Sequence, residues 1–554
     1  MTQAVRWTHG DASLGRAVEQ ALASGAKPLR SDARRVITHV QLDDGTQILV
    51  KQFRVGSGRH ATRERIKACI GRAPAAREWR HLEALHALGI GVPEPLALGT
   101  RSDGDRLLLL EWVDGTPLPV ALDASPAQRR ALVGRLAACV RAVHAHGFAH
   151  GDLHAGNVLV RAGEPILLDW QHARRTRRVR ARRADLAQLE HSLAPITPRS
   201  LRVRLRHSVL GTQATAAGLR AAGRAVDSRW HAHARSRTAH ACRPGRIACA
   251  IDVQGARGLA VHAVDPAALA SLLAAHAAAV RVRDPSLLES GTRARVSAGR
   301  LGGRPVIVKQ TPWRGIGRAL ADAVRGSPAQ RGWRGGHGLR IRGIGAAEPI
   351  AAVTRRRLGV PLTAWLVLED LRPAPTAVAA LERGEPEAAA VIDAVTTLAI
   401  ALHRARVDHG DLKGTHVFLC ERAGRQVPHL IDLEGVRFCH RRLSDARRVR
   451  SLAQINASLP DALPARLRRP AFARYAVALP FASGTDITLR RVVRASLARR
   501  HRWSGADCAV AATCSAATPS PSPPTAIGSS WTSAGSCRRG RLRSAATRRP
   551  RPCR

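Results

Sequence analysis

The chain contains one series of motifs twice, and this duplication constrains its fold more than any other feature. ILVKQF returns as VIVKQT, LLLLEWVDG returns as WLVLEDL, and HGFAHGDLHAGNVLV returns as ARVDHGDLKGTHVFL. The offset between the copies is 258 residues at Lys51 and Lys309, and 259 residues at Asp152 and Asp411. Solenoid repeats have periods of only about 20 to 50 residues. The sequence therefore predicts one whole domain duplicated in tandem.

The repeats divide the 554 residues into three segments: a first copy at 1–240, a second copy at 245–508 and a tail at 509–554. We expect the copies to join in the stretch WHAHARSRTAHACRPGR at 230–246, which we interpret as irregular. The tail contains no Asp or Glu and is rich in Ser, Pro, Thr and Arg. Such a composition is typical of disorder, so we expect a disordered basic tail, with an out-of-frame origin left open.

Each copy is expected to place strands before helices. ILVKQF and VIVKQT are short apolar runs that follow turn residues, which predicts strands, as do RLLLLEWV and AWLVLE. Leu132, Leu136, Val140 and Val143 recur at helical spacing before the first HGD, and the second HGD follows a similar pattern. NVLV with PILLDW, and HVFL with HLIDLE, predict hairpins. The predicted fold class is α+β, with two lobes in each copy.

The net charge of +48 comes from 89 Lys and Arg against 41 Asp and Glu. Only five of the basic residues are Lys, and Arg and Ala dominate throughout, as in a GC-rich coding sequence. Aromatic residues make up 3% of the chain, too few for an extensive surface that stacks single-stranded bases. We therefore expect no dedicated nucleic-acid binding.

The remaining composition favours a cytoplasmic protein. The best apolar candidate for a membrane span, 267–280, is short and is interrupted by His276, so no span is expected. The N-terminal residues have no apolar core, so no secretory signal is expected. None of the ten Cys forms a CxxC pair, which argues against a cysteine metal cluster or a disulfide framework.

The first copy contains a full set of residues for phosphoryl transfer, which needs a cation for the phosphates, Mg²⁺ ligands and a base. Lys51 lies at the end of a predicted strand, and Glu78, early in a helix, is placed to pair with it. Asp152 in HGDLHAGN is the candidate base, although HGD is also typical of a plain turn. Asn157 and Asp169 offer oxygen ligands for Mg²⁺.

The second copy is altered. Lys309, Asp411 and Asp432 match the first copy, but His416 stands in place of the Asn, and Gly332 in place of the Glu. A neutral imidazole is a weaker Mg²⁺ ligand than oxygen, so His416 is either a metal ligand or a structural hydrogen-bonding residue. The ammonium of Lys309 lacks its expected carboxylate partner.

These motifs resemble the protein-kinase-like superfamily, and within it the bacterial lipopolysaccharide kinases, which phosphorylate Kdo or heptose of the inner core. HGDL followed by an apolar pair and then Asp is shared with aminoglycoside kinases. GIGVPEPLALG at 89–99, SLAQINASLP at 451–460 and the segment around SPAQRGW are similar to the lipopolysaccharide branch, in which a His in place of the Asn is common. The resemblance covers about 490 of the 554 residues.

The resemblance implies two tandem bilobal domains, each with a small β-rich N-lobe and a larger helical C-lobe, that use ATP and Mg²⁺. It places Glu111 and Glu369 at the hinges that meet adenine. It assigns Lys413 either a contact with the transferred phosphate or a solvated position. It implies an anionic lipid-linked saccharide as acceptor, a cytoplasmic location and peripheral contact with the inner membrane face. The basic run at 174–183 could grip such an acceptor or form a solvated face.

Two departures from the superfamily pattern are visible. Neither copy has a clear GxGxxG loop; LLESGTRARV at 287–296 and RSDARRVITHV are the nearest candidates. Trp170 follows the metal Asp where protein kinases carry Phe, which fits small-molecule and lipopolysaccharide kinases better.

Three other functions remain open. The chain could be a protein Ser/Thr kinase or an aminoglycoside-type kinase, although its positive charge disfavours a polycationic substrate. One or both copies, the second above all, could be a nucleotide-binding pseudokinase scaffold. A basic nucleic-acid binder would leave the duplicated Lys–Asp–Asp pattern unexplained.

Overall fold

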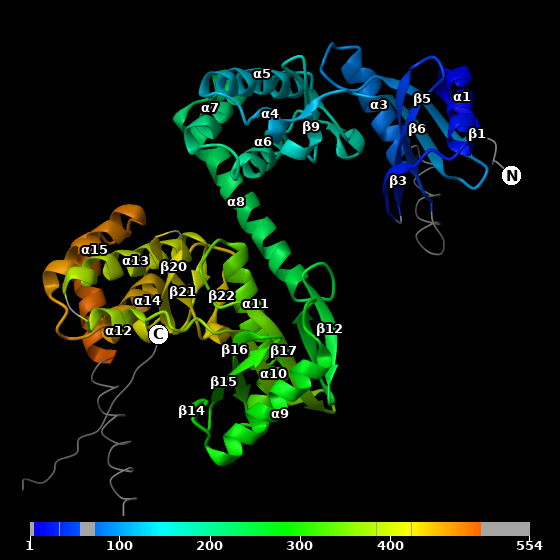
Figure 1. Ribbon diagram of the computed structural model, residues 1–554. Helices are drawn as coiled ribbons and strands as arrows, with labels where there is room; N and C mark the ends of the chain where they lie inside the picture. The colour runs from blue at the N-terminus through cyan, green and yellow to red at the C-terminus, as the bar shows by residue number, and fades with distance from the viewer. Residues whose placement is uncertain (1–4, 33, 56–72, 384, 423, 500–554) are drawn as a thin grey trace, which may run out of the picture.

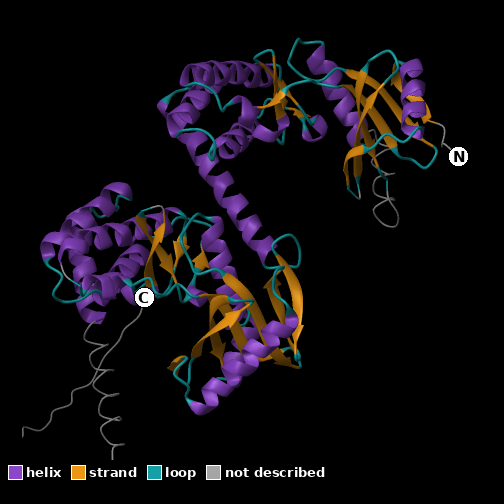
Figure 2. Cartoon of the chain, viewed as in Figure 1, coloured by secondary structure: helices purple, strands orange, loops and turns teal. Residues whose placement is uncertain are grey.

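The computed structural model describes residues 5–32, 34–55, 73–383, 385–422 and 424–499. Figure 1 shows two bodies, each with a sheet at one end and a bundle of helices at the other, and the long helix α8 (Ala216–Ala241) runs between them. Figure 2 shows that each body has one lobe built on a large sheet with helices packed against it and one lobe that is mainly helical with short strands. The expected α+β class with two tandem bilobal units is confirmed. The tail expected at 509–554 lies outside the described residues.

The first body opens with a six-stranded antiparallel sheet in the order β1-β5-β6-β4-β3-β2. Its strands are β1 (Val5–Gly10), β2 (Pro28–Ser31), β3 (Arg35–Gln41), β4 (Gln47–Phe53), β5 (Pro95–Arg101) and β6 (Arg106–Glu111), and its helices are α1 (Ala12–Ala23) and α3 (Pro74–His86). Side chains alternate along β4. Ile48 and Val50 pack with Val18 of α1, whereas Lys51 faces α3 on the other side of the sheet.

The helical lobe of the first body follows. Its helices are α4 (Leu118–Ala121), α5 (Pro126–Ala145), α6 (Val179–Leu193), α7 (Arg199–Leu210) and α8, and its short strands are β7 (Thr116–Pro117), β8 (Phe148–Ala149), β9 (Val158–Arg161), β10 (Glu164–Leu167) and β11 (Arg174–Arg175). α5 begins with a capping box between Ser125 and Gln128 and buries the predicted apolar stripe. It ends just before the HGD segment, as expected. β9 and β10 form the predicted hairpin.

The second body repeats this plan with a seven-stranded sheet in the order β12-β13-β17-β18-β16-β15-β14. Its strands are β12 (Ala248–Val253), β13 (Ala256–Val261), β14 (Leu287–Ser290), β15 (Arg295–Leu301), β16 (Arg304–Thr311), β17 (Pro349–Arg357) and β18 (Val360–Glu369), and its helices are α9 (Pro266–Val282), α10 (Ile316–Arg325) and α11 (Pro328–Ile341). Leu269 and Leu272 of α9 pack on one face, and Trp333 of α11 packs on the other.

The second helical lobe carries the second HGD segment. Its helices are α12 (Ala377–Leu381), α13 (Glu385–Arg404), α14 (Asp445–Ser458) and α15 (Ala465–Ala478), and its strands are β19 (Val407–Asp408), β20 (Val417–Arg422), β21 (Arg425–Leu430) and β22 (Arg437–Phe438). The predicted hairpin is the pair β20–β21. The two lysines occupy equivalent registers, because Lys51 pairs with Leu108 and Lys309 pairs with Leu366.

The structure corrects the interpretation of the stretch at 230–246 as irregular. Residues 230–241, interpreted as irregular, form the last three turns of α8. Ala and Arg are among the best helix formers, and the first Pro of the stretch is Pro244, beyond the helix end. The C-terminal part of α8 packs on α11, where the indole N–H of Trp333 donates to the carbonyl of Ala241 at 2.7 Å.

The apolar stretch at 267–280 lies within α9 and packs on the second sheet. Within the described residues, no helix has the length and apolar content needed to cross a bilayer.

Candidate functional site

In the first body, a buried ion pair joins the sheet to α3. Lys51 Nζ lies 2.6 Å from Glu78 Oε1, and both side chains are buried. Pro74 begins α3, and the helical turn that buries Trp79 and Leu82 aims Glu78 at the sheet. Glu78 Oε2 is buried without a hydrogen-bond partner among the described residues. The predicted ion pair between Lys51 and Glu78 is therefore present in the structure.

Asp169 lies below this pair, at the end of the segment that follows β10. Its backbone is left-handed, with a φ of 65°, which a short polar side chain tolerates better than most. Its carboxylate lies 3.8 Å from Lys51 Nζ and 3.3 Å from the guanidinium of Arg35. Trp170 is fully buried, and its indole N–H donates to the carbonyl of Leu167 at 2.9 Å. Packing of Trp170 therefore holds Asp169 towards the lysine.

Helix α6 holds the HGD loop of the first body from behind. The carboxylate of Asp185, almost fully buried, accepts the backbone N–H groups of His150 at 2.7 Å and Gly151 at 2.9 Å. The amide of Gln188 donates to Asp152 Oδ1. Asn157 Nδ2 donates to the carbonyl of Asp152 at 3.0 Å, which leaves the Asn157 amide oxygen available to a cation. The loop backbone and the side chain of the candidate base, Asp152, are thus both held by α6.

Sequence analysis missed Arg35, Asp185 and Gln188. Asp185 and Gln188 occur in RRADLAQLE. The acidic residues of this segment directly follow the strongly basic run at 174–183. Arg35 belongs to RSDARRVITHV, which the sequence analysis treated only as a weak phosphate-loop candidate. An acidic residue in a basic helix was the one feature that could have identified Asp185. It does not indicate which backbone N–H groups the carboxylate would accept.

In the second body the lysine is held differently. Lys309 Nζ lies 2.7 Å from Asp432 Oδ1 and 3.1 Å from Glu434 Oε1. Burial acts to lower the pKa of Lys309, but the carboxylates of Glu434 and Asp432 outweigh it, so the pKa is raised. Burial acts to raise the pKa of Asp432, and the ammonium of Lys309 reverses this, so the pKa is lowered. Lys309 therefore has a carboxylate partner that the sequence analysis did not find.

Behind the second HGD loop, the helix contributes an amide but no carboxylate. Gln454 of α14 donates to the carbonyl of Gly410 at 2.9 Å, and Ser451 occupies the helix position of the first body's buried acid. Lys413 Nζ lies 3.0 Å from Asp411 Oδ2, so this lysine meets the candidate base directly. The ring of His416 hydrogen-bonds to the carbonyl of Asp411 at 3.0 Å. That bond matches the one made by the Asn in the first body.

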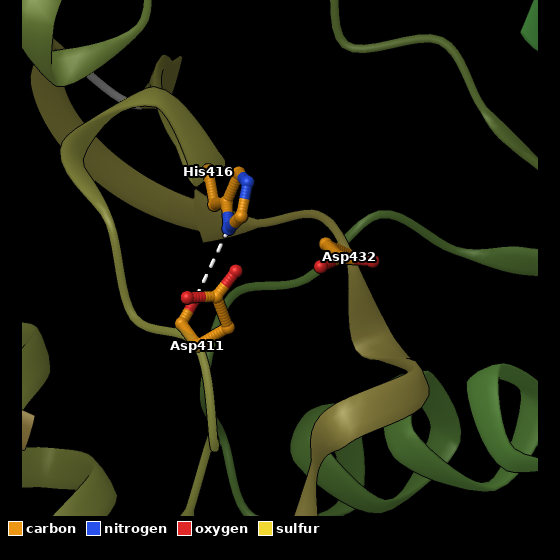
Figure 3. A group of neighbouring side chains, drawn as sticks. All are labelled: Asp411, His416 and Asp432. Carbon is orange, nitrogen blue, oxygen red and sulfur yellow. Dashed lines mark hydrogen bonds between the residues drawn. The ribbon is translucent and has the colours of Figure 1, made fainter. Parts of the chain in front are cut away.

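Three side chains of the second body converge on one small space (Figure 3). One ligand atom from each of Asp411, His416 and Asp432 lies within 4.8 Å of the others. The set fits a divalent cation, because two carboxylates and an imidazole are common metal ligands. The imidazole makes this donor set softer than that of the first body. The oxygen ligands of Asn157 and Asp169 in the first body suit Mg²⁺.

These ligands line a cavity of about 560 Å³ between the lobes of the second body. Lys309, Glu434, Glu369 and the segment around Leu288 also line it. Cofactor sites commonly have volumes of about 300 to 1,000 Å³. A second cavity of about 680 Å³, lined mainly by apolar residues of α13, α14 and α15, is separate from this chemistry.

The predicted hinge glutamates use their carboxylates in structural contacts. Glu111 pairs with Arg161 and accepts the backbone N–H of Glu94 at 3.2 Å. Glu369 likewise accepts the N–H of Glu348 at 3.2 Å. Both stand at the last position of the strand that leads from sheet to helical lobe. Their side chains therefore brace the strand ends, and the hinge role of their backbones stays a prediction.

Comparison with known families follows this geometry. The model of the lipopolysaccharide kinase (Kdo/WaaP) family matches residues 19–207 and 309–469. Among solved structures, the chain is similar to WaaP in complex with acyl carrier protein, with 21% identity and a TM-score of 0.31 over 40% of this chain and 99% of that one. It is also similar to an aminoglycoside-3'-phosphotransferase of type VIII, with 18% identity and a TM-score of 0.28 over 39% and 99%.

Two curated relatives are subunits of another assembly. The EKC/KEOPS complex subunit bud32 of Emericella nidulans is 25% identical over 179 residues, which cover 24% of this chain and 63% of that protein. The KEOPS complex subunit Bud32 of Pyrococcus abyssi is 26% identical over 118 residues, which cover 21% and 52%. The chain thus spans less than two thirds of either relative.

Proposed function

The chain belongs to the lipopolysaccharide kinase (Kdo/WaaP) family, and from this premise we propose that its first body transfers the γ-phosphate of ATP to a sugar hydroxyl of the lipopolysaccharide inner core. The buried ion pair between Lys51 and Glu78, with the carboxylate of Asp169 3.8 Å from Lys51 Nζ, carries the proposal. The coarser function, a kinase-type phosphotransferase, follows from family membership.

Each residue then has a chemical task. Lys51, oriented by Glu78, binds the phosphates that lead to the reacting group. Asp169 and the amide oxygen of Asn157 would hold Mg²⁺, which supplies charge neutralisation for the phosphates. Asp152 accepts the proton of the acceptor hydroxyl. The hydroxyl oxygen forms a bond to the γ-phosphorus, the bond from that phosphorus to the β–γ bridging oxygen breaks, and ADP leaves with the electron pair.

The surface beside the HGD loop supports an anionic acceptor. β11 pairs with β8, so the basic run at 174–183 begins beside the short strand that leads into the HGD segment. Arg177 and Arg178 of this run are exposed. An anionic saccharide and an anionic leaflet both suit such a surface. We therefore propose action in the cytoplasm, at the inner membrane face.

The acceptor is tested by measuring transfer of labelled γ-phosphate from ATP with purified inner-core lipopolysaccharide, an aminoglycoside and a basic protein as alternative acceptors. We expect transfer to the lipopolysaccharide alone, and its loss when EDTA removes the divalent cation. Transfer to either other acceptor instead would assign a different kinase class. Failure of the wild type to transfer phosphate to any of the three would overturn the proposal.

The acceptor surface makes a second prediction. Arg177→Ser/Arg178→Ser removes two exposed charges, so the KM for the lipopolysaccharide should rise about 10-fold with little change in kcat or in the KM for ATP. The double variant Arg243→Ser/Arg246→Ser removes the same charge from exposed positions near the end of α8. Equal KM values in the two double variants would show that the basic run does not bind the acceptor.

A further inference from the structure

The second body lacks a glutamate on the helix beside its lysine, but a glutamate reaches the lysine from another element. Glu434 lies two residues after Asp432, in the single turn η5 (Leu433–Gly435), and its Oε1 is 3.1 Å from Lys309 Nζ. The corresponding residue of the first body is Gln171, whose neutral amide donates to Asp169 at 3.4 Å. The glutamate that pairs with the lysine therefore comes from helix α3 in the first body and from the turn η5 in the second.

Helix α11 packs closely at the position where the first body carries its glutamate. A Cβ atom at Gly332 would lie 2.4 Å from Leu366 Cδ2, closer than side chains allow. A Cβ at Gly335 would lie 2.3 Å from the carbonyl oxygen of Leu433. Glycines thus let α11 press directly against η5 and the sheet. This close approach packs η5, which carries Glu434, tightly against the helix, and a side chain at Gly332 would require the Leu366 methyl group to shift.

We propose that Glu434 is the positioning residue for Lys309, so that the second body binds a nucleoside triphosphate. This inference rests on the phosphotransferase function proposed above and extends it to the second body. Asp432 also pairs with Lys309, yet Asp432 belongs to the candidate cation ligands with Asp411 and His416. Glu434 lies outside that ligand group, so it can keep Lys309 extended into the cavity while Asp432 faces a cation.

The test isolates the second body in the full chain. Lys51→Met/Glu78→Leu removes the first body's ion pair as a unit and serves as the common background. Binding of ATP in the presence of MnCl₂ is then measured by isothermal titration calorimetry. The chains compared are the background and the background that also carries Glu434→Gln, Glu434→Asp or Glu421→Gln. Glu421 is an exposed glutamate on β20, so its variant is the matched control for loss of one charge.

We expect Glu434→Gln to weaken ATP binding by about 10- to 100-fold, because a charge-assisted contact to Lys309 is lost. The ATP affinity of Glu434→Asp should lie between those of the background and Glu434→Gln. The ATP affinity of Glu421→Gln should equal that of the background. The midpoint of thermal unfolding without nucleotide should stay close to that of the background, whereas the shift produced by ATP should shrink.

Two results would overturn the inference without touching the first body's function. One is equal ATP affinity in the Glu434→Gln and Glu421→Gln chains. The other is a background chain that binds no ATP although the wild type transfers phosphate. A wild type that neither binds ATP nor transfers phosphate would remove both the inference and the proposed function.

Discussion

Asp152→Asn should lower kcat for phosphate transfer by about 10²- to 10⁴-fold, the usual contribution of a positioned general base. The amide keeps an oxygen that can accept from Gln188, and Asp185 still holds the loop backbone. The variant should therefore fold normally and bind ATP with nearly unchanged affinity. Steady-state transfer to inner-core lipopolysaccharide, together with the melting temperature, measures both parts of this expectation.

Asp411→Asn is the matched control for Asp152→Asn, because it makes the same change at the equivalent loop position. If the first body alone transfers phosphate, Asp411→Asn should retain most of the activity. Partial loss in each variant would instead show that both bodies turn over. Full activity in Asp152→Asn would contradict its assignment as the base.

Lys51→Met should abolish transfer and also destabilise the first body. It leaves the fully buried carboxyl group of Glu78 without its partner, and breaking a buried pair in this way costs about 3 to 5 kcal/mol. Lys51→Met/Glu78→Leu removes both charges, so most of the lost stability should return. Activity should not return, because no ammonium meets the phosphates. Chemical unfolding and phosphate transfer, measured on all three chains, separate the two effects.

The outcome of this cycle distinguishes a phosphate-binding lysine from a merely structural one. If Lys51 only filled a buried ion pair, the double variant would regain activity along with stability. Lys51→Arg adds a second check, since it keeps the charge but changes the shape of the donor. It should retain stability better than Lys51→Met and still transfer phosphate poorly.

Much of the fold could be predicted from local patterns. Apolar runs after turns gave the strands that carry Lys51 and Lys309, and the stripe from Leu132 to Val143 became the buried face of α5. The end of α8 was not predicted, because His and Arg at 230–241 looked irregular in one dimension. Contact with the second body supplies a buried face for those residues, and no sequence window contains that contact.

The paired motifs also predicted which residues would gather in each site. A motif that recurs at a nearly constant offset can be recognised without knowing any contact in the fold. The repetition therefore identified Lys51, Asp152 and Asp169 and their equivalents in the second body as candidates. The supports of the loops were different. Asp185 meets the loop backbone 34 and 35 residues away, and that distance in sequence reflects how α6 packs behind the loop.

The repeated motifs were enough to predict that a kinase-like unit occurs twice, that the lysine and the two aspartates recur, and that Gly332 stands where the first copy has glutamate. The consequence of that replacement depends on how the folded chain packs. Gly332 and Gly335 let α11 approach η5 closely, and in that arrangement Glu434 meets Lys309. Spacing reports which residues a motif shares, but a carboxylate can reach an ammonium from any element, so their pairing depends on packing in three dimensions.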